Sequence, residues 1–238
     1  GEDRVRVGHM RTLDKTALRR AIVEARQYTR ALVDDLDDAQ WRVPQLDTVN
    51  PMLREVGHVG WFMERWCLRW QEPSRAPTSS LLEHADRWYD SSMVPHATRW
   101  NLDLPSRAAT LRYLDAVLDA TLDRLERVAD DTAALYFFQL ALYHEDMHGE
   151  AFAYTRQTCG YPAPAAARAT APSATGDVRL PGGPFERGAP RSADGFVFDN
   201  EKWGHVEEVA PFAIARRPIS QREFAEFVDD DGYRRSEW

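Results

Sequence analysis

The sequence predicts a chain of two parts, a helical bundle followed by a smaller segment that mixes helix and strand. In the first two-thirds of its 238 residues, apolar residues recur at the spacing of helices that pack against one another. A stretch rich in Pro and Ala, residues 162–175, then interrupts the pattern and indicates a linker. Beyond it, short apolar runs alternate with Gly and Pro, as in strands joined by turns.

The composition is that of an ordinary globular protein, with 43% hydrophobic and 29% charged residues. The net charge is -8 and the basic residues are dispersed, which argues against nucleic acid as a partner. The chain has no apolar run of membrane-spanning length and no secretory signal pattern, so we expect no membrane association. Its two cysteines form no redox or metal-ligand motif, which favours a cytoplasmic protein.

Four main helices are expected before the linker. The first ten residues resemble vector-derived sequence, so His9 is set aside as a candidate ligand. An apolar stripe opposite a charged face predicts a helix over residues 14–36. Asn50 and Pro51 form a good helix start, because Asn caps and Pro fits the first turn. The helix that they open, to about residue 70, is apolar on nearly all sides and should be central and buried.

Two further main helices and a short one are expected downstream. A short one should cover about residues 80–93. Ser106 then caps an amphipathic helix, whose apolar face carries Leu111, Leu114, Leu118, Leu122 and Leu125. The last helix begins near Asp131 and ends at Gly160, and Pro162 is a stop signal. Such helices with a longer central crossover indicate a bundle, and bundles build metal sites from side chains on facing helices.

After the linker, the sequence indicates a mixed α/β segment. Residues 178–180 and 206–209 have the pattern of short strands, and residues 180–185 that of a strand broken by a turn. Ser220 and Glu223 form a capping box that opens a short helix. The segment up to the last residue has too few elements to close a core of its own.

His144 and His148 are the most informative pair of residues. They lie four residues apart in the last predicted helix, so both imidazoles share one face and can reach a single ion. Apolar residues continue this face and turn it toward the core: Phe137, Leu140, Ala141, Ala151 and Phe152. Two buried neutral histidines need partners, and a metal ion satisfies both. The alternative is a pair of surface histidines flanked by acids.

His58, on the buried second helix, is the best candidate for a third ligand. His84 and His96 lie in polar segments, and His205 belongs to the segment after the linker. Three histidines without cysteine suit zinc, iron, copper or nickel. Because all three ligands are neutral, the charge of the ion is uncompensated, which favours an anionic further ligand.

The neighbours of these histidines have two interpretations each. Glu145, Asp146 and Glu150 surround the pair, and carboxylates can orient ligating imidazoles. A solvated acidic face is at least as good an interpretation for Glu145, and an equal alternative for Glu150. Aromatic residues near His58 are expected to be core rather than a cage for a quaternary ammonium group: Trp61, Phe62 and Trp66. Cys67 and Cys159 are expected to be inert buried thiols.

Several stretches of the chain resemble known families. Residues 55–64 (EVGHVGWFME), the run from His144 to His148 and the helical array resemble a DinB-like domain. His205 and four further stretches resemble the formylglycine-generating-enzyme (sulfatase-modifying factor) domain, which is C-type-lectin-like: residues 180–188, 196–201, 211–214 and 218–227. Two such domains in this order are similar to the ergothioneine-synthase family of non-haem iron sulfoxide synthases and its selenium relative, selenoneine synthase.

The resemblance implies a multi-domain α and α+β fold. Residues 11–161 would be a DinB-like four-helix bundle that contains the metal site, and residues 162–175 the linker. Residues 176–238 would be the N-terminal part of a mixed α/β formylglycine-generating-enzyme-like domain. The active-site tyrosine of the family and most hercynine contacts would lie beyond Trp238.

The resemblance also implies a reaction. His58, His144 and His148 match the iron ligands of the family, so the cofactor would be Fe(II). The enzyme would attach sulfur or selenium to the imidazole C2 of hercynine (Nα-trimethylhistidine). Dioxygen and a thiol or selenosugar donor would be the other substrates.

Two residues are candidates for contact with the donor. Members that use sulfur commonly carry two glutamines between the histidines, where this chain has Asp146 and Met147. This difference favours the selenium branch and makes Met147 a candidate contact. Residues 86–89 fall where some relatives bind the carboxylates of the donor, so Arg87 is the other candidate, with a surface salt bridge as the alternative.

Two other functions fit the same motifs. A DinB-like thiol transferase would use a similar three-histidine site to hold zinc or another divalent ion and activate a thiol without redox chemistry. The segment after Gly176 argues against it, because simple DinB transferases lack such a segment. The other is a non-catalytic helical binding module.

Overall fold

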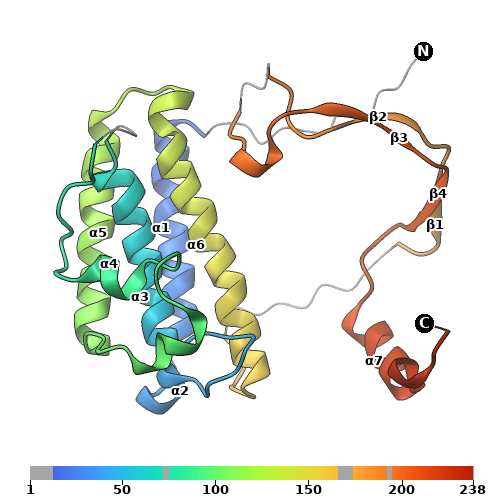
Figure 1. Ribbon diagram of the computed structural model, residues 1–238, viewed down its shortest axis with the longest axis horizontal. Coiled ribbons are helices and arrows are strands. Elements are labelled where there is room, and N and C mark those ends of the chain that lie inside the picture. Colours follow the sequence, from blue (N-terminus) through green and yellow to red (C-terminus); the bar gives the residue numbers. More distant parts are fainter. Residues whose placement is uncertain (1–12, 72–74, 166–173, 192–194, 238) are drawn as a thin grey trace. The chain divides into compact units, whose positions relative to one another are not determined.

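The computed structural model describes residues 13–71, 75–165, 174–191 and 195–237, so His9 and much of the predicted linker lie outside the described residues (Figure 1). The chain divides into two compact units. A helical unit comprises Gly1–Ala167 with Ser192–Asp199, and a second unit comprises Arg168–Arg191 with Asn200–Trp238. The predicted fold class, helical first and mixed afterwards, is confirmed.

Four helices form the bundle of the helical unit, and they run side by side in Figure 1: α1 (Lys15–Val33), α3 (Met52–Met63), α5 (Arg107–Arg127) and α6 (Thr132–Thr158). Helix α3 packs against both α5 and α6, and α1 packs against α6. Ten of the twelve residues of α3 are buried, which confirms the prediction of a central helix. Among the described residues, no helix combines the length and the apolarity that a membrane span requires.

Three of the four bundle helices begin where the sequence predicts. Asp14, Ser106 and Asp131 each accept a hydrogen bond from the backbone three residues on, and so cap α1, α5 and α6. The prediction for Asn50 was wrong. The N-cap of α3 is Pro51, without a side-chain hydrogen bond, because Asn50 Oδ1 instead accepts from Arg99 Nη1 at 2.8 Å.

The connection between α3 and α5 is less helical than predicted. Helix α3 continues as a π-helical turn (Glu64–Arg69), and α4 covers only Ala85–Tyr89. His84, with φ 65°, is left-handed and prevents an earlier start of α4. Asp90 ends the helix, because its side chain accepts from the backbone N of Ser92 at 2.9 Å and stabilises a turn.

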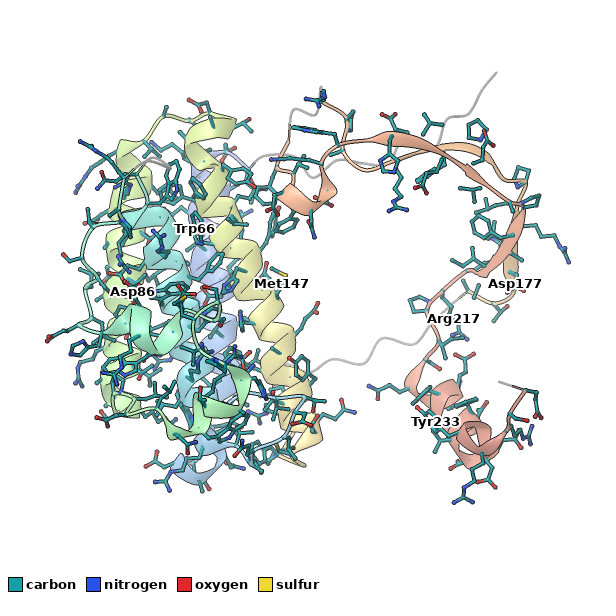
Figure 2. All side chains as sticks on the ribbon, in the orientation of Figure 1. Trp66, Asp86, Met147, Asp177, Arg217 and Tyr233 are labelled. Atoms are coloured by element: carbon teal, nitrogen blue, oxygen red, sulfur yellow. The ribbon has the colours of Figure 1, made fainter. Side chains whose placement is uncertain are left out.

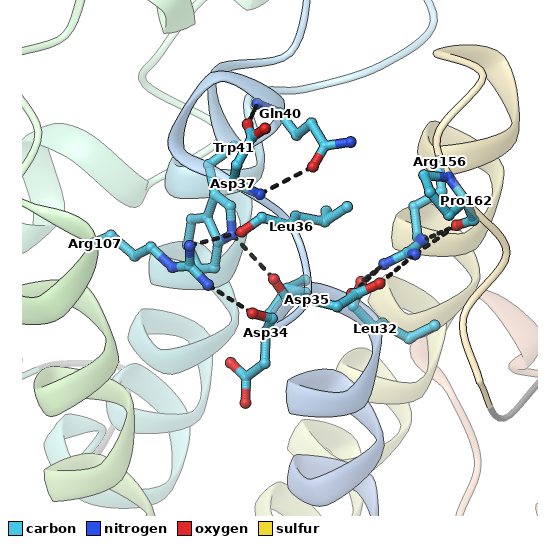
Figure 3. Close-up of polar contacts among 11 residues, drawn as sticks. Leu32, Asp34, Asp35, Leu36, Asp37, Gln40, Trp41, Arg107, Arg156 and Pro162 are labelled. Atoms are coloured by element: carbon cyan, nitrogen blue, oxygen red, sulfur yellow. Dashed lines mark hydrogen bonds and ion pairs between the residues drawn. The ribbon is translucent and has the colours of Figure 1, made fainter.

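One end of the bundle is held by two arginines (Figure 3). Arg156 of α6 is buried and donates to both carboxylate oxygens of Asp35 at 2.7 and 2.8 Å, and to the carbonyl oxygens of Leu32 and Pro162. Arg107 of α5 donates to the carbonyl oxygens of Asp34 and Leu36, and stacks on Trp41 of the short helix α2 (Asp38–Arg42). These contacts bind the end of α1 to the ends of α5 and α6.

An aromatic clasp, residues 195–198, belongs to the helical unit although it lies beyond the linker in sequence. Phe196 and Val197 are buried. The ring of Phe196 stacks on Tyr136 of α6 with 5.0 Å between centroids, and it meets Tyr143 edge-on at 5.1 Å. Tyr136 also donates its hydroxyl hydrogen to the carbonyl oxygen of Val197 at 3.2 Å.

The described part of the second unit contains the strands β1 (Asp177–Leu180), β2 (Gly183–Arg187), β3 (His205–Val209) and β4 (Phe212–Ala215). The helix α7 (Gln221–Asp229) and a short 3-10 helix (Gly232–Arg234) follow them. Strands β1 and β4 pair antiparallel, as do β2 and β3. The predicted strands and the capping box of Ser220 and Glu223 are confirmed. Of the described residues in this unit, only Ala189 and Gly232 are buried, as expected for a segment without a core of its own.

Candidate metal centre

His58 of α3 meets His144 and His148 of α6 inside the helical unit. The ring centroid of His58 lies 5.0 Å from each of the other two, which are 4.5 Å apart. One ligand atom from each of the three residues lies within 4.8 Å of the others. Within the described part of the chain, no other group of His, Cys, Asp or Glu meets this criterion. The structure therefore brings together the three residues that the sequence singled out.

The spacing of the nitrogens fits a metal ion. The Nε2 atoms of His144 and His148 lie 3.2 Å apart. Metal–imidazole bonds are about 2.0–2.1 Å long, so two nitrogens on one ion are roughly 2.8–3.4 Å apart at octahedral to tetrahedral angles. The two rings can therefore bind a common ion with little movement.

In His58 and His148, hydrogen bonds determine which ring nitrogen is available to a metal ion. His58 Nδ1 lies 2.7 Å from the carbonyl oxygen of Tyr89, and His148 Nδ1 lies 2.7 Å from Glu55 Oε1. Both partner oxygens accept, so both Nδ1 atoms carry the hydrogen. The lone pairs of the two rings are therefore on Nε2, as ligation through Nε2 requires. Gly57, without a side chain, allows Tyr89 to pack against α3 at this point.

His144 is held differently. Its ring stacks on Phe62 with 3.6 Å between centroids and 8° between planes. Its Nδ1 is buried and has no hydrogen-bond partner among the described residues. Since His148 Nε2 is an acceptor, the 3.2 Å contact with His144 Nε2 requires either a hydrogen or a cation between the two nitrogens. The Nε2 lone pairs of His58 and His148 are therefore available to a cation that lies among the three rings.

Burial keeps two of the three rings neutral. The pKa of His58 is lowered to about 3, mainly by desolvation and to a smaller extent by repulsion from His148. The same two causes, in the same order, hold the pKa of His144 well below its ordinary range. Both rings are therefore uncharged at neutral pH and present lone pairs to a cation.

The predicted donor contacts lie at the surface of the helical unit. Met147 is 51% exposed on α6, directly before His148, and Figure 2 labels it at the edge of the bundle. Arg87 is exposed on α4, and no ion pair joins its side chain to another described residue, so the alternative of a surface salt bridge is not found. Its neighbour Asp86 is the residue that binds an arginine, Arg69, at 2.7 Å.

Glu145 corrects one sequence interpretation, since it belongs to no solvated acidic face. Its side chain is 1% exposed and pairs with Arg26 of α1 at 2.8 and 3.1 Å. Thr29 donates to the same carboxylate at 2.8 Å. Asp146 and Glu150 are exposed. Glu145 thus holds α6 to α1, while the next residues of the helix reach solvent.

The remaining predictions are of mixed outcome. Trp61 and Cys67 are buried as expected, whereas Phe62 and Trp66 are half-buried, and Phe62 contacts the centre directly. Burial raises the pKa of the Cys67 thiol, as in an inert cysteine. His96 is not a free polar residue, because its Nε2 lies 2.7 Å from the carbonyl oxygen of Val49.

Sequence reasoning missed Glu55, which contacts His148 across 93 positions of the chain. The available signal was an acid near the start of a predicted helix that is apolar on nearly all sides, three residues before His58. A buried carboxylate requires a partner, and a histidine of a metal site is a frequent one.

Comparisons with known proteins agree with this geometry. Residues 21–152, more than half of the chain, match the model of the DinB superfamily. The chain belongs to the DinB superfamily. Its DinB segment contains all three histidines of the centre. Residues 162–238 match the model of the sulfatase-modifying factor enzyme 1-like domain.

This DinB chain is also similar to three proteins named hercynine oxygenase. It is 34% identical to that of Mycolicibacterium thermoresistibile over 230 residues, which cover 94% of the chain and 50% of the relative. It is 33% identical to that of Mycobacterium tuberculosis over 224 residues, covering 91% and 51%. The protein of Mycolicibacterium smegmatis is 31% identical over 222 residues, covering 90% and 50%.

The DinB chain thus spans about half the length of the curated relatives that it matches. The predicted resemblance to the ergothioneine-synthase family, with a DinB domain before a sulfatase-modifying-factor domain, is confirmed. The matches do not distinguish the selenium branch of this family from the sulfur branch.

Proposed function

We propose that this chain is the metal-binding half of an iron- and dioxygen-dependent enzyme that forms a C–S or C–Se bond at the imidazole C2 of hercynine. The observation that carries the proposal is the convergence of three imidazoles, two of which burial keeps neutral. The names of the relatives support hercynine as substrate. Because the chain spans half of those relatives, the activity is assigned to the full-length protein that contains it.

His58, His144 and His148 would hold the iron. Three histidines leave further coordination positions of the ion free, as in non-haem iron oxygenases. When bound, Fe(II) would activate dioxygen by reducing it. Dioxygen would be the oxidant when a C–H bond is replaced by a carbon–chalcogen bond. The side chain of His148 is 19% exposed, so small molecules can approach the centre from that side.

The residues around the centre would orient the ligands and exclude water. Phe62 fixes the plane of His144 by stacking, and the carbonyl oxygen of Tyr89 fixes His58. Met147 and Arg87 are exposed and therefore available to a donor. We propose a selenosugar as this donor, since Asp146 and Met147 replace the two glutamines that sulfur-using members commonly carry.

We further propose the domain organisation that the sequence predicted, with a bundle over residues 11–161, a linker over 162–175 and a second domain from 176. The cytoplasm is the proposed location, because Cys67 and Cys159 are both free thiols.

Turnover by the full-length protein tests the proposal. The protein, loaded with Fe(II) under nitrogen, would receive hercynine and a mixture of selenosugar, cysteine and γ-glutamylcysteine, and then dioxygen. We expect oxygen consumption only when hercynine and a donor are both present, and mass spectrometry identifies the chalcogen installed. Transfer to a thiol without oxygen consumption would support a thiol transferase instead. Wild-type protein without stoichiometric metal would support a binding module.

A further inference from the structure

Glu55 differs from the other buried carboxylates of the helical unit. It lies in the first turn of α3 and is 2% exposed. Glu64 and Glu145 each use both oxygens in hydrogen bonds to side chains or backbone that lie outside the metal centre. Glu55 directs Oε1 to His148 Nδ1 at 2.7 Å, and its Oε2 is buried without a hydrogen-bond partner among the described residues.

We propose that Glu55 is a positioning residue that holds the ring of His148 with Nε2 toward the metal and strengthens that bond. The inference rests on the proposed function, because it assumes that the three histidines bind a metal. It assigns a role to a residue that touches the ligand and not the metal or the substrate.

The geometry restricts the ring of His148 to one tautomer. A carboxylate has no hydrogen to donate, so His148 Nδ1 carries the hydrogen and Nε2 has the lone pair. The negative charge behind the ring also raises the electron density on Nε2. Mutation of a residue that hydrogen-bonds a metal ligand in this way typically changes metal affinity about 10- to 100-fold.

Positive groups near Glu55 do not divert its carboxylate from His148. Arg54 and Arg99 are close enough to interact electrostatically with Glu55. Arg54 donates to Trp88, Tyr89 and Ser91, and Arg99 to Asn50 and Val94. No hydrogen bond joins either guanidinium to Glu55 within the described part of the chain, so the hydrogen bond of the carboxylate goes to His148.

The three rings of the centre are therefore oriented by unlike partners. His58 donates to a neutral carbonyl oxygen, and His144 stacks on Phe62. His148 alone donates to a charged group. Glu55 thus places a carboxylate in direct contact with one of the three ligands, which favours a divalent ion over an empty centre.

Two variants of the full-length protein test this role. Glu55→Gln keeps the size and an acceptor oxygen but removes the charge, and Glu55→Ala removes both. Long-range ¹H–¹⁵N NMR of the metal-free protein reports which nitrogen of His148 carries the hydrogen. Anaerobic competition with a chelator reports the affinity for Fe(II), and for Co(II) as a second probe.

We expect hydrogen on Nδ1 in the wild type and in Glu55→Gln, and a mixture of tautomers in Glu55→Ala. Metal affinity should fall about 10-fold in Glu55→Gln and up to about 100-fold in Glu55→Ala. Glu64→Gln is the matched control, since it removes a buried charge from the continuation of the same helix. It should lower stability while leaving the His148 tautomer and the metal affinity unchanged.

Affinities within twofold of wild type in both Glu55 variants would overturn the inference, as would hydrogen on His148 Nε2 in the wild type. If Glu55→Ala fails to fold, Glu55→Gln and the wild-type spectrum decide. A wild-type protein that binds neither ion would overturn the proposed function instead, and the NMR measurement would still show whether Glu55 orients the ring.

Discussion

The ring of Tyr89 lies directly against the backbone of Gly57. A Cβ built on Gly57 would be 2.3 Å from Tyr89 Cε1 and Cζ, closer than real carbon atoms approach. Tyr89 is fully buried, and its carbonyl oxygen accepts from His58. A residue without a side chain thus sets the distance between α3 and α4, and with it the orientation of one candidate metal ligand.

Gly57→Ala should therefore destabilise the fold and weaken metal binding together. Ala favours a helix over Gly by about 1 kcal/mol, but overpacking costs typically about 1–3 kcal/mol, and the displaced ring carries the Tyr89 carbonyl away from His58. Urea unfolding and chelator competition measure the two effects. Gly60→Ala, whose Cβ would meet a flexible methyl of Leu114 at 3.0 Å, is the control and should leave metal affinity unchanged. Equal affinity in both variants would contradict the expectation.

Metal should stabilise the helical unit through the three histidines jointly. At a free metal concentration about 100 times Kd, binding contributes about 2.7 kcal/mol to the free energy of unfolding. Alanine at His58, His144 or His148 should each abolish most of the rise in Tm on adding Fe(II) under nitrogen. His84→Ala, at an exposed position, should retain it. A full rise in any of the three variants would remove that residue from the ligand set.

The buried pair of Arg26 and Glu145 should be strongly coupled. Removing one partner leaves a charge buried without compensation, which typically costs about 3–5 kcal/mol. We expect a large loss of stability in Arg26→Met and in Glu145→Gln, and a loss in the double variant that is well below the sum. Urea unfolding of the four proteins gives the coupling free energy. Simple additivity would show that the two side chains act independently.

Asp86 should contribute stability that acid removes. Its hydrogen bond from Arg69 lowers the pKa of Asp86 to about 2, from an ordinary value near 3.8. A carboxyl whose pKa is lower in the folded state stabilises the fold above about pH 4, and this contribution is lost as the pH falls toward 2. The side chain is 56% exposed, so solvent screens the pair and the effect should be about 1 kcal/mol or less.

The measurement is the difference in unfolding free energy between wild type and Asp86→Asn, taken from pH 6 to pH 2. This difference should shrink through the lower half of that range, because only the wild type loses the ion pair. Asp123→Asn, which removes a 4.0 Å pair on the surface of α5, should have a smaller effect. If the difference in unfolding free energy stays constant down to pH 2, Arg69 does not bind the ionised form of Asp86 in preference to the protonated form.

Local sequence signals predicted most of the helical unit. Periodicity and capping residues located α1, α5 and α6, because Asp14, Ser106 and Asp131 bind only their own first turns. They failed where a distant residue competed. Asn50 has the chemistry of a cap, but Arg99, 49 positions away, takes its side-chain oxygen. The left-handed conformation of His84, which shortens α4, likewise has no local sequence signal for a non-glycine residue.

The candidate centre shows the same division. The spacing of His144 and His148 fixes their common face whatever surrounds the helix, so the pair could be predicted. His58 emerged by elimination, and its convergence with the pair depends on how α3 packs against α6. The partners of Glu55 and Glu145 could not be predicted, because each lies about a hundred positions away, His148 and Arg26 respectively.

The aromatic clasp has a practical consequence for recombinant work on this chain. An excised bundle that stops at the linker would lack Phe196 and Val197, which cover Tyr136 and part of Tyr143 in the intact chain. Its α6 would then present a bare aromatic strip to water and invite self-association. The place where the sequence changes character is therefore not the place where the helical unit can be cut.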